Sequence, residues 1–266
     1  MKKSLQTVIY TAVTAPFFIF GNLTTKDNQS ISFYHYQGGH KQVVIIAPGF
    51  YNSKDAILLQ ELKDKLKDDY DVFMFDFRGH GQSSGVFYWT SKEELDLQTV
   101  LDYVRKKYSK IGLIAFSLGA ATSINLLAKQ DAVNSLIAIS APSEFSKIDY
   151  KFWNLDFKGD LMYTFGEEGR VGRGVRPGPF WLDKAKPIDY VAKVKCPILY
   201  IHGDKDWVIG YQHSQQLYAK TKSKKEIIIV KNGSHAEYLF KDESGLKTID
   251  SIKSWLKMTL KDGGEK

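Results

Sequence analysis

The amino-acid sequence predicts an α/β protein with a mostly parallel central sheet and helices on both faces. Short, continuously apolar runs, typical of strands buried on both faces, alternate with segments whose apolar residues recur at helical spacing. The connections between these segments are short, which favours parallel strands joined by crossover helices. At 266 residues, the chain is long enough for one large domain of this kind with a small insertion.

The first elements are expected to form a hairpin that leads into the sheet. Residues 17–23, 31–36 and 43–47 have the composition of three strands. Turn-forming residues at 26–29 separate the first two strands, and a Gly-Gly pair separates the second from the third.

Helices and strands alternate from there to the end of the chain. Ser53 is expected to cap a helix, because its hydroxyl can accept a hydrogen bond from the first helical turn. The apolar face of this helix consists of Ile57, Leu58, Leu62 and Leu66. The later elements are strands at 72–75, 111–116, 136–139, 198–202 and 226–230, and helices at 91–108, 118–127, 211–219 and 245–260.

Residues 141–188 interrupt this alternation. They are rich in aromatic residues without a clean period, and they include a loop-like run of glycines and arginines. Because this stretch directly follows a sheet strand, we interpret it as a cap insertion over the strand ends; the alternative is a second apolar patch that only packs on the body. The core then comprises residues 17–140 and 189–261, and residues 262–266 form a tail.

The N-terminal segment, residues 1–16, allows two interpretations. Lys2 and Lys3 precede an apolar stretch, as in a signal peptide, but polar residues and Pro16 interrupt it, and it is too short to span a bilayer. We favour an ordered segment packed on a cytoplasmic protein. The alternative is export, or membrane-surface contact through residues 1–20.

Composition excludes several classes of function. The net charge of +7 arises from lysines scattered among acidic residues, without the aromatic-interleaved basic stripe of a nucleic-acid-binding protein. Cys196 is the single cysteine, so an intrachain disulfide and a cysteine-based metal cluster are both excluded. The six histidines show no ligand spacing, so no metal site is expected.

Ser117 lies where the predicted strand at 111–116 meets the helix at 118–127. A serine on a sharp strand-to-helix turn has its hydroxyl lifted clear of the sheet, and the small residues Ala115, Gly119 and Ala121 let strand and helix approach closely. This is the arrangement of a nucleophile elbow. The usual motif is Gly-x-Ser-x-Gly, however, and Ala115 stands at its first position, so the pentapeptide alone is weak support.

Two later strand-end loops carry the partners that a nucleophilic serine needs. Asp204 and Asp206 follow the strand at 198–202, and His235 follows the strand at 226–230. Loops at the carboxyl ends of parallel strands meet at one edge of the sheet. A histidine there can take the serine proton, and an aspartate can orient the imidazole. Each residue alone is more often a turn or surface residue, but all three in the order Ser, Asp, His indicate a triad.

At this point the chain resembles the α/β-hydrolase superfamily over roughly residues 17–260. It is most similar to the branch with bacterial esterases, cinnamoyl-esterase-like enzymes, monoacylglycerol-lipase-like proteins and serine aminopeptidases. The resemblance implies that Asp206, two residues before the apolar Val208, is the acid rather than Asp204. The segments that carry it are residues 47–50 (APGF), 76–83 (DFRGHGQS), 115–119 (AFSLG), 202–206 (HGDKD) and 233–235 (GSH).

The resemblance also implies an oxyanion hole made by the backbone amides of Phe50 and Leu118. Relatives carry His-Gly-x in the first of these loops, and here Pro48 replaces the histidine, which bears on loop shape more than on chemistry. His80 belongs to a segment whose role in the family is structural. We therefore expect a serine hydrolase that cleaves small carboxylic esters without a cofactor. Alternatives on the same triad are a thioesterase, a peptidase or amidase and a carbon–carbon hydrolase; the non-enzyme alternative is an inactive hydrolase fold used for binding.

The predicted cap suggests which substrates fit. Its aromatic residues favour an apolar or aromatic acyl or alcohol group, whereas its arginines either meet a carboxylate or phosphate or belong to a solvated loop. The candidate substrate-binding residues are Phe152, Trp153, Phe180, Trp181, Arg173 and Arg176.

Overall fold

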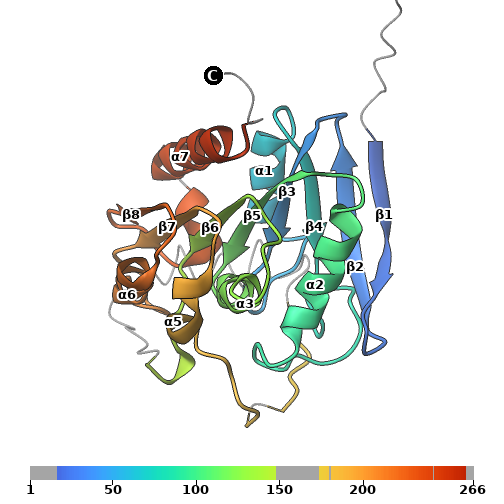
Figure 1. Ribbon diagram of the computed structural model, residues 1–266, viewed down its shortest axis with the longest axis horizontal. Coiled ribbons are helices and arrows are strands. Elements are labelled where there is room, and N and C mark those ends of the chain that lie inside the picture. Colours follow the sequence, from blue (N-terminus) through green and yellow to red (C-terminus); the bar gives the residue numbers. More distant parts are fainter. Residues whose placement is uncertain (1–16, 148–173, 180, 242, 262–266) are drawn as a thin grey trace, which may run out of the picture.

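The computed structural model describes residues 17–147, 174–179, 181–241 and 243–261. Their centre is an eight-stranded sheet in the order β1-β2-β4-β3-β5-β6-β7-β8 (Figure 1). The predicted N-terminal segment at 1–16, much of the predicted cap and the tail at 262–266 lie outside the described residues. The strands are β1 (Phe17–Thr24), β2 (Ser30–Gln37), β3 (Gln42–Ala47), β4 (Asp71–Phe75), β5 (Lys110–Phe116), β6 (Ser135–Ile139), β7 (Ile198–Gly203) and β8 (Lys225–Val230).

The sheet is parallel except at its N-terminal edge. β1 pairs with β2, and β2 with β4, in antiparallel fashion, while every other neighbouring pair is parallel. The expected hairpin is therefore confirmed. β2 and β3, although consecutive along the chain, are separated in the sheet by β4.

Helices cover both faces of the sheet, as the sequence predicts. α2 (Glu93–Val104), α3 (Leu118–Leu127) and α6 (Gln212–Lys220) pack on one face, and α2 and α3 lie in front of the sheet in Figure 1. α1 (Ile57–Leu66) and α7 (Glu243–Thr259) pack on the other face. The short elements are η1 (Phe145–Lys147), α5 (Pro187–Tyr190), η4 (Val191–Lys193) and η5 (Ala236–Phe240).

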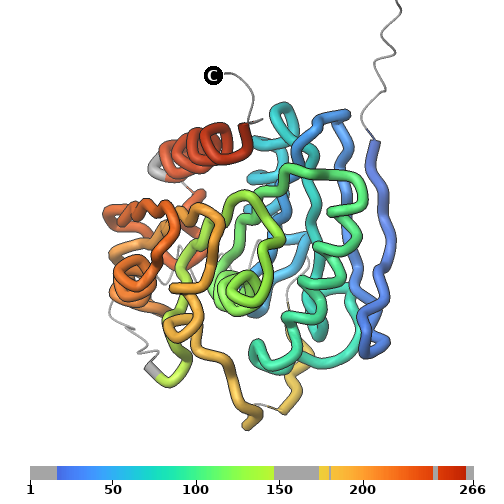
Figure 2. Tube along the Cα trace, in the orientation of Figure 1, coloured from blue at the N-terminus to red at the C-terminus, as the bar shows by residue number. Residues whose placement is uncertain are grey.

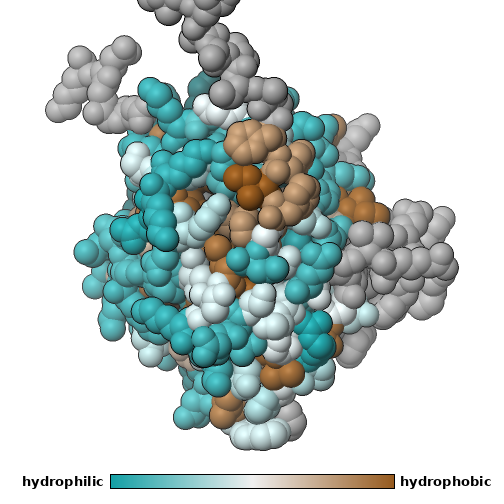
Figure 3. All heavy atoms as spheres, turned by 90° about the vertical axis from the view of Figure 1, so that its right-hand side faces the viewer, coloured by the Kyte–Doolittle hydropathy of each residue, from teal (hydrophilic) through white to brown (hydrophobic). Residues whose placement is uncertain are grey.

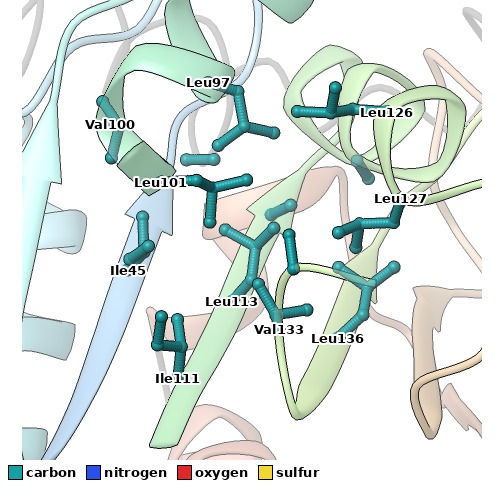
Figure 4. Packing of buried hydrophobic residues seen from close by; sticks show 14 of the residues in the cluster. Ile45, Leu97, Val100, Leu101, Ile111, Leu113, Leu126, Leu127, Val133 and Leu136 are labelled. Carbon is teal, nitrogen blue, oxygen red and sulfur yellow. The ribbon is translucent and has the colours of Figure 1, made fainter. Parts of the chain in front are cut away.

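Two hydrophobic clusters form the core, because successive side chains of a strand point to opposite faces. In β3, Val43 and Ile45 join the cluster beneath α2 and α3, whereas Val44 and Ile46 join the cluster beneath α1 and α7. Figure 4 shows the first cluster, in which side chains from α2, α3 and the central strands interlock. A strand buried on both faces is apolar throughout, which is why the central strands read as continuous runs.

The helix start predicted at Ser53 is wrong. α1 begins at Ile57, after Ala56, and no side chain caps it. The Ser53 hydroxyl instead accepts the amide of Asp55 (3.2 Å), and its carbonyl accepts the amide of Ala56 (3.1 Å). Ser53 therefore stabilises a separate turn that precedes the helix.

An aromatic surface lies on the outermost strand, β1. Phe17, Phe18 and Phe20 are 49%, 45% and 65% exposed. Figure 3 looks onto this side of the molecule and shows apolar side chains gathered among hydrophilic ones. In Figure 2 the start of β1 and the end of α7 lie at the same end of the molecule, which is the end where the parallel strands begin. Strands β2, β4 and β3 separate this aromatic surface from β5, whose last residue precedes Ser117.

The described residues include no helix long and apolar enough to cross a membrane.

Candidate active site

Ser117 occupies a strained turn between β5 and α3. Its φ of 48° and ψ of −112° lie in a region that residues with a side chain rarely adopt. The turn is held because the Ser117 amide donates to the carbonyl of Ile139 in β6 (2.7 Å) and its carbonyl accepts the amide of Ala121 (3.1 Å). These bonds fix the backbone that presents the Ser117 hydroxyl at the carboxyl end of the sheet.

Small residues make this turn sterically feasible. A Cβ atom at Gly119 would lie 2.4 Å from the carbonyl oxygen of Pro48, so only glycine fits against this loop. Ala115 is fully buried in β5, with Ala47 and Ala138 as its register partners on the two neighbouring strands. Its neighbours' short side chains leave room for the methyl group that distinguishes this chain from the usual motif.

His235, in the loop after β8, connects Ser117 to Asp206. Its Nε2 lies 3.1 Å from Ser117 Oγ, and its Nδ1 lies 2.7 Å from Asp206 Oδ2. The loop is anchored directly after the histidine, because the amide of Ala236 donates to the hydroxyl of Ser140 at the end of β6 (3.0 Å). Both anchoring residues have left-handed backbone conformations, with φ of 53° for Ala236 and 50° for Ser140.

Asp206 is buried and fully hydrogen-bonded. Its Oδ1 accepts the amides of Val208 (2.9 Å) and Ile209 (2.8 Å), and its Oδ2 lies 2.7 Å from His235 Nδ1 and 3.1 Å from His202 Nε2. Burial alone would raise the pKa of Asp206, but the charge of His235 and hydrogen bonds from His202 and His235 outweigh it. The net effect holds the pKa of Asp206 well below its ordinary value, so the carboxylate stays ionised at neutral pH.

Asp204, the other candidate acid, points elsewhere. Its Oδ1 is buried without a hydrogen-bond partner among the described residues, and its backbone amide donates to the carbonyl of Val230 (3.0 Å). The structure thus brings Asp206, and not Asp204, to the imidazole of His235.

The three groups form a chain suited to proton transfer. Because the Asp206 carboxylate can only accept, Nδ1 of His235 carries the hydrogen of their bond. In the neutral ring, Nε2 then has a lone pair directed toward the Ser117 hydroxyl. This arrangement can remove the hydroxyl proton as the oxygen attacks, and the carboxylate can stabilise the resulting imidazolium.

The backbone amides of Phe50 and Leu118 adjoin this chain of groups. A Cβ atom at Gly49 would lie 3.4 Å from both the Ser117 Cβ and the carbonyl oxygen of Phe116, so the loop of residues 48–50 packs directly against the elbow. Neither amide donates to an acceptor within the described part of the chain. Both donors are therefore free to bind an incoming oxygen atom.

A buried lysine secures the loop that contains Phe50. Lys54 is 1% exposed, its amide donates to Asp76 Oδ1 (2.7 Å), and its Nζ donates to Asp76 Oδ2 (2.8 Å). The ring of Phe50 packs on Trp89 (5.2 Å between centroids) and Phe87 (5.4 Å). The loop is thus tied to the end of β4 on one side and to an aromatic cluster on the other.

His80 belongs to a buried network and makes no described contact with Ser117. Its Nδ1 lies 3.1 Å from the carbonyl oxygen of Arg78, whose guanidinium is paired with Asp96 (2.7 Å) and Asp27 (2.7 Å). Burial lowers the pKa of His80 to about 4, so the ring is neutral at neutral pH.

The candidate substrate residues are only partly described. Phe152, Trp153, Arg173 and Phe180 lie outside the described residues. Trp181 is 72% exposed. The guanidinium of Arg176 donates to backbone carbonyls of Gly81, Ser83 and Gly85 and so stabilises that turn. A substrate-binding role for these six residues stays a prediction.

Sequence reasoning missed the residues that support the site from behind, namely His202, Ser140 and Lys54. The signals for His202 were its place at the end of a predicted strand and its position as the first residue of the 202–206 segment that carries the family resemblance. Nothing in the sequence singled out Ser140 or Lys54. Among the described residues, no cluster of histidine, cysteine, aspartate and glutamate is arranged to hold a metal ion.

Comparison with known proteins agrees with this fold. A sequence profile for the family described as "alpha/beta hydrolase fold" matches residues 42–167, which include Ser117. Esterase Pf2001 of Pyrococcus furiosus superposes with a TM-score of 0.72 at 22% identity, covering 92% of this chain and 91% of that one. The α/β hydrolase GrgF of Penicillium sp. sh18 superposes with a TM-score of 0.77 at 15% identity, covering 93% and 99%. The chain thus has the α/β-hydrolase fold.

The curated relatives found by sequence differ in how much of their length this chain covers. YfhR of Escherichia coli (strain K12) is 28% identical over 186 residues, which cover 66% of this chain and 57% of the relative. This chain thus spans little more than half the length of that protein. The mouse serine hydrolase BPHL is 24% identical over 275 residues and matches 86% of both chains.

Proposed function

We propose that the protein is a serine hydrolase that cleaves carboxylic esters through an acyl-enzyme formed on Ser117. The observation that carries this proposal is the continuous hydrogen-bonded chain from Ser117 Oγ through His235 to Asp206. In the proposed catalytic triad, Ser117 is the nucleophile, His235 the general base and acid, and Asp206 the orienting carboxylate.

In the acylation step, Ser117 Oγ attacks the ester carbonyl carbon while its proton passes to His235 Nε2. The carbonyl oxygen becomes an oxyanion, which we assign to the free amides of Phe50 and Leu118. Collapse of the tetrahedral intermediate breaks the bond to the alcohol, which leaves with the proton from His235. The acyl group remains attached to Ser117 through an ester bond.

Deacylation repeats the sequence with water. His235 removes a proton from a water molecule, whose oxygen attacks the acyl carbon, and the same two amides hold the second oxyanion. Collapse of this intermediate releases the carboxylic acid and returns the proton to Ser117. The ionised Asp206 stabilises the imidazolium in both halves of the reaction.

The aromatic surroundings of the oxyanion loop support an apolar or aromatic small-molecule ester as substrate. Phe50 is 40% exposed and packs in a cluster with Phe87 and Trp89. The rings of this cluster favour contact with apolar groups of a substrate over contact with charged groups. The names of two relatives, esterase Pf2001 and serine hydrolase BPHL, are in line with ester hydrolysis.

The test compares the parent protein with Ser117→Ala on p-nitrophenyl esters of graded chain length, with a thioester and an anilide beside them. We expect the parent to hydrolyse the esters fastest, and Ser117→Ala to lose at least about 10³-fold in kcat. The matched control is Ser251→Ala, a serine on the surface of α7 that bonds only its own helix.

Covalent labelling gives a second readout. A fluorophosphonate probe should modify the parent and Ser251→Ala at Ser117, and leave Ser117→Ala unmodified. Full turnover by Ser117→Ala would overturn the mechanism, and faster cleavage of the thioester or anilide would overturn the ester preference.

A further inference from the structure

His202 is a fully buried histidine at the end of β7, directly behind the proposed catalytic acid. Its Nε2 lies 2.8 Å from the carbonyl oxygen of Ile209 and 3.1 Å from Asp206 Oδ2. Its Nδ1 lies 2.6 Å from the hydroxyl of Ser214 in α6. Each ring nitrogen therefore has a partner, and one of them shares a carboxylate oxygen with His235.

The chemistry of these partners determines where the hydrogen sits. A backbone carbonyl and an ionised carboxylate can only accept hydrogen bonds, so Nε2 of His202 must carry a hydrogen. That hydrogen is shared between Ile209 and Asp206. The hydroxyl of Ser214 can donate or accept, and it satisfies Nδ1 in either case.

The Asp206 carboxylate is consequently held at both oxygens. Oδ1 is fixed by the amides of Val208 and Ile209, and Oδ2 receives hydrogen bonds from two imidazoles. The Ile209 carbonyl that binds His202 and the Ile209 amide that binds Asp206 belong to one residue, so the histidine ties the carboxylate to its own loop. Without His202, Oδ2 would keep His235 as its one donor among these groups, and the carboxyl plane could rotate about the Cβ–Cγ bond.

We propose that His202 is a positioning residue, which acts through Asp206 to keep the imidazole of His235 directed at Ser117. Ser214 fixes the ring of His202 and so couples α6 to the site. This inference rests on the proposed function, because its catalytic consequence requires the triad. The structural part, an Nε2–H of His202 donating to Asp206, holds or fails independently of any activity.

The kinetic test uses two substitutions of one residue. In His202→Gln, the side-chain amide can place a donor near the position of Nε2; in His202→Leu, the donor is lost while an apolar group fills the space. A shift of the triad by about 1 Å is enough to cost about 10²-fold in rate. We therefore expect His202→Leu to lower kcat about 10-fold to 100-fold with KM changed less than about twofold, and His202→Gln to recover most of that loss.

A matched control separates positioning from general destabilisation. His35 is a buried histidine in β2, bonded to Tyr108 (2.9 Å) and Gln37 (3.1 Å) and remote from the triad. His35→Leu should lower stability as His202→Leu does, yet leave kcat unchanged. Equal kcat values in the parent and His202→Leu, or equal losses in His202→Leu and His35→Leu, would overturn the proposal.

A spectroscopic measurement on the parent protein needs no variant to fold. With ¹⁵N-labelled histidine, the nitrogen chemical shifts should show Nε2 of His202 protonated, and the His235 proton bonded to Asp206 should appear far downfield. An unprotonated Nε2 at His202 would overturn the inference even if the protein is an esterase. A protonated Nε2 in a protein that the fluorophosphonate probe does not label would support the positioning geometry and overturn the proposed function alone.

Discussion

Gly119 offers the sharpest test of the proposed oxyanion hole. An added Cβ atom would lie 2.4 Å from the Pro48 carbonyl oxygen and 2.8 Å from that of Ala47. Both atoms belong to the backbone and cannot swing aside as the end of a side chain can. Gly119→Ala therefore forces the loop at 47–50 away from the elbow by about 1 Å, the difference between 2.4 Å and an ordinary contact of 3.4 Å.

The expected magnitude follows from the geometry of the proposed donors. A displacement of about 1 Å moves the Phe50 amide out of hydrogen-bond range of an oxyanion that the Leu118 amide still holds. Loss of one such donor typically costs about 10²-fold to 10³-fold in kcat. We expect Gly119→Ala to fall in this range with a small change in KM, because the missing bond forms mainly in the transition state.

The matched control is Gly49→Ala in the facing loop. Its new Cβ would make ordinary contacts of 3.4 Å with the Ser117 Cβ and the Phe116 carbonyl oxygen. Its activity should stay within a few-fold of the parent. The assay is initial-rate hydrolysis of a p-nitrophenyl ester, with circular dichroism to verify folding. Parent-like activity in a folded Gly119→Ala, or a larger loss in Gly49→Ala, would refute this account of the oxyanion loop.

Three further outcomes are expected. Burial lowers the pKa of His35 and of His80 from 6.5 to about 4. Between pH 4 and pH 6.5 the unfolded chain therefore binds more protons than the folded protein does. The contribution of each histidine to the free energy of unfolding is therefore complete above about pH 6.5 and is lost as the pH falls toward 4. The loss between pH 7 and pH 5 amounts to about 2 kcal/mol per histidine. Urea unfolding at these two pH values should measure it, and in His35→Leu the combined loss should be half as large. Ala115→Gly should hydrolyse the test esters at the rate of the parent protein, and inactivation would show that the turn is built differently. If residues 1–20 contact membranes, deleting residues 2–16 should reduce co-sedimentation with anionic vesicles; equal binding would refute that role.

The central strands were predictable because burial on both faces leaves a local trace. β3 to β7 each appear in the sequence as a continuous apolar run, and the observed bounds differ from the predicted ones by a residue or so. Sheet order leaves no such trace. β4 lies between β2 and β3 because of pairings such as Tyr36 with Val72 and Val44 with Val72, which join segments distant in sequence.

Helix ends were predicted less well, because competing local hydrogen bonds decide them. Ser53 has the chemistry of a cap, but its hydroxyl is used in the turn before Ala56. The helix predicted over 91–108 is shorter, since α2 begins at Glu93 and ends at Val104. Glu93 is buried there and accepts the amide of Tyr88 (2.7 Å), a contact that composition cannot reveal.

The choice between Asp204 and Asp206 rests on the family resemblance, which favours Asp206, because the residues of the loop alone do not decide it. Both are acids in one turn after β7, and either could form a local turn with the amides that follow it. The backbone settles the matter, because the Asp204 amide pairs with Val230 of β8 and the next turn directs the amides of Val208 and Ile209 at Asp206. That turn also brings the carboxylate against His202. The pairing of β7 with β8, a long-range contact, thus determines which of the two acids reaches His235, whereas the loop sequence alone supplies two chemically equivalent candidates.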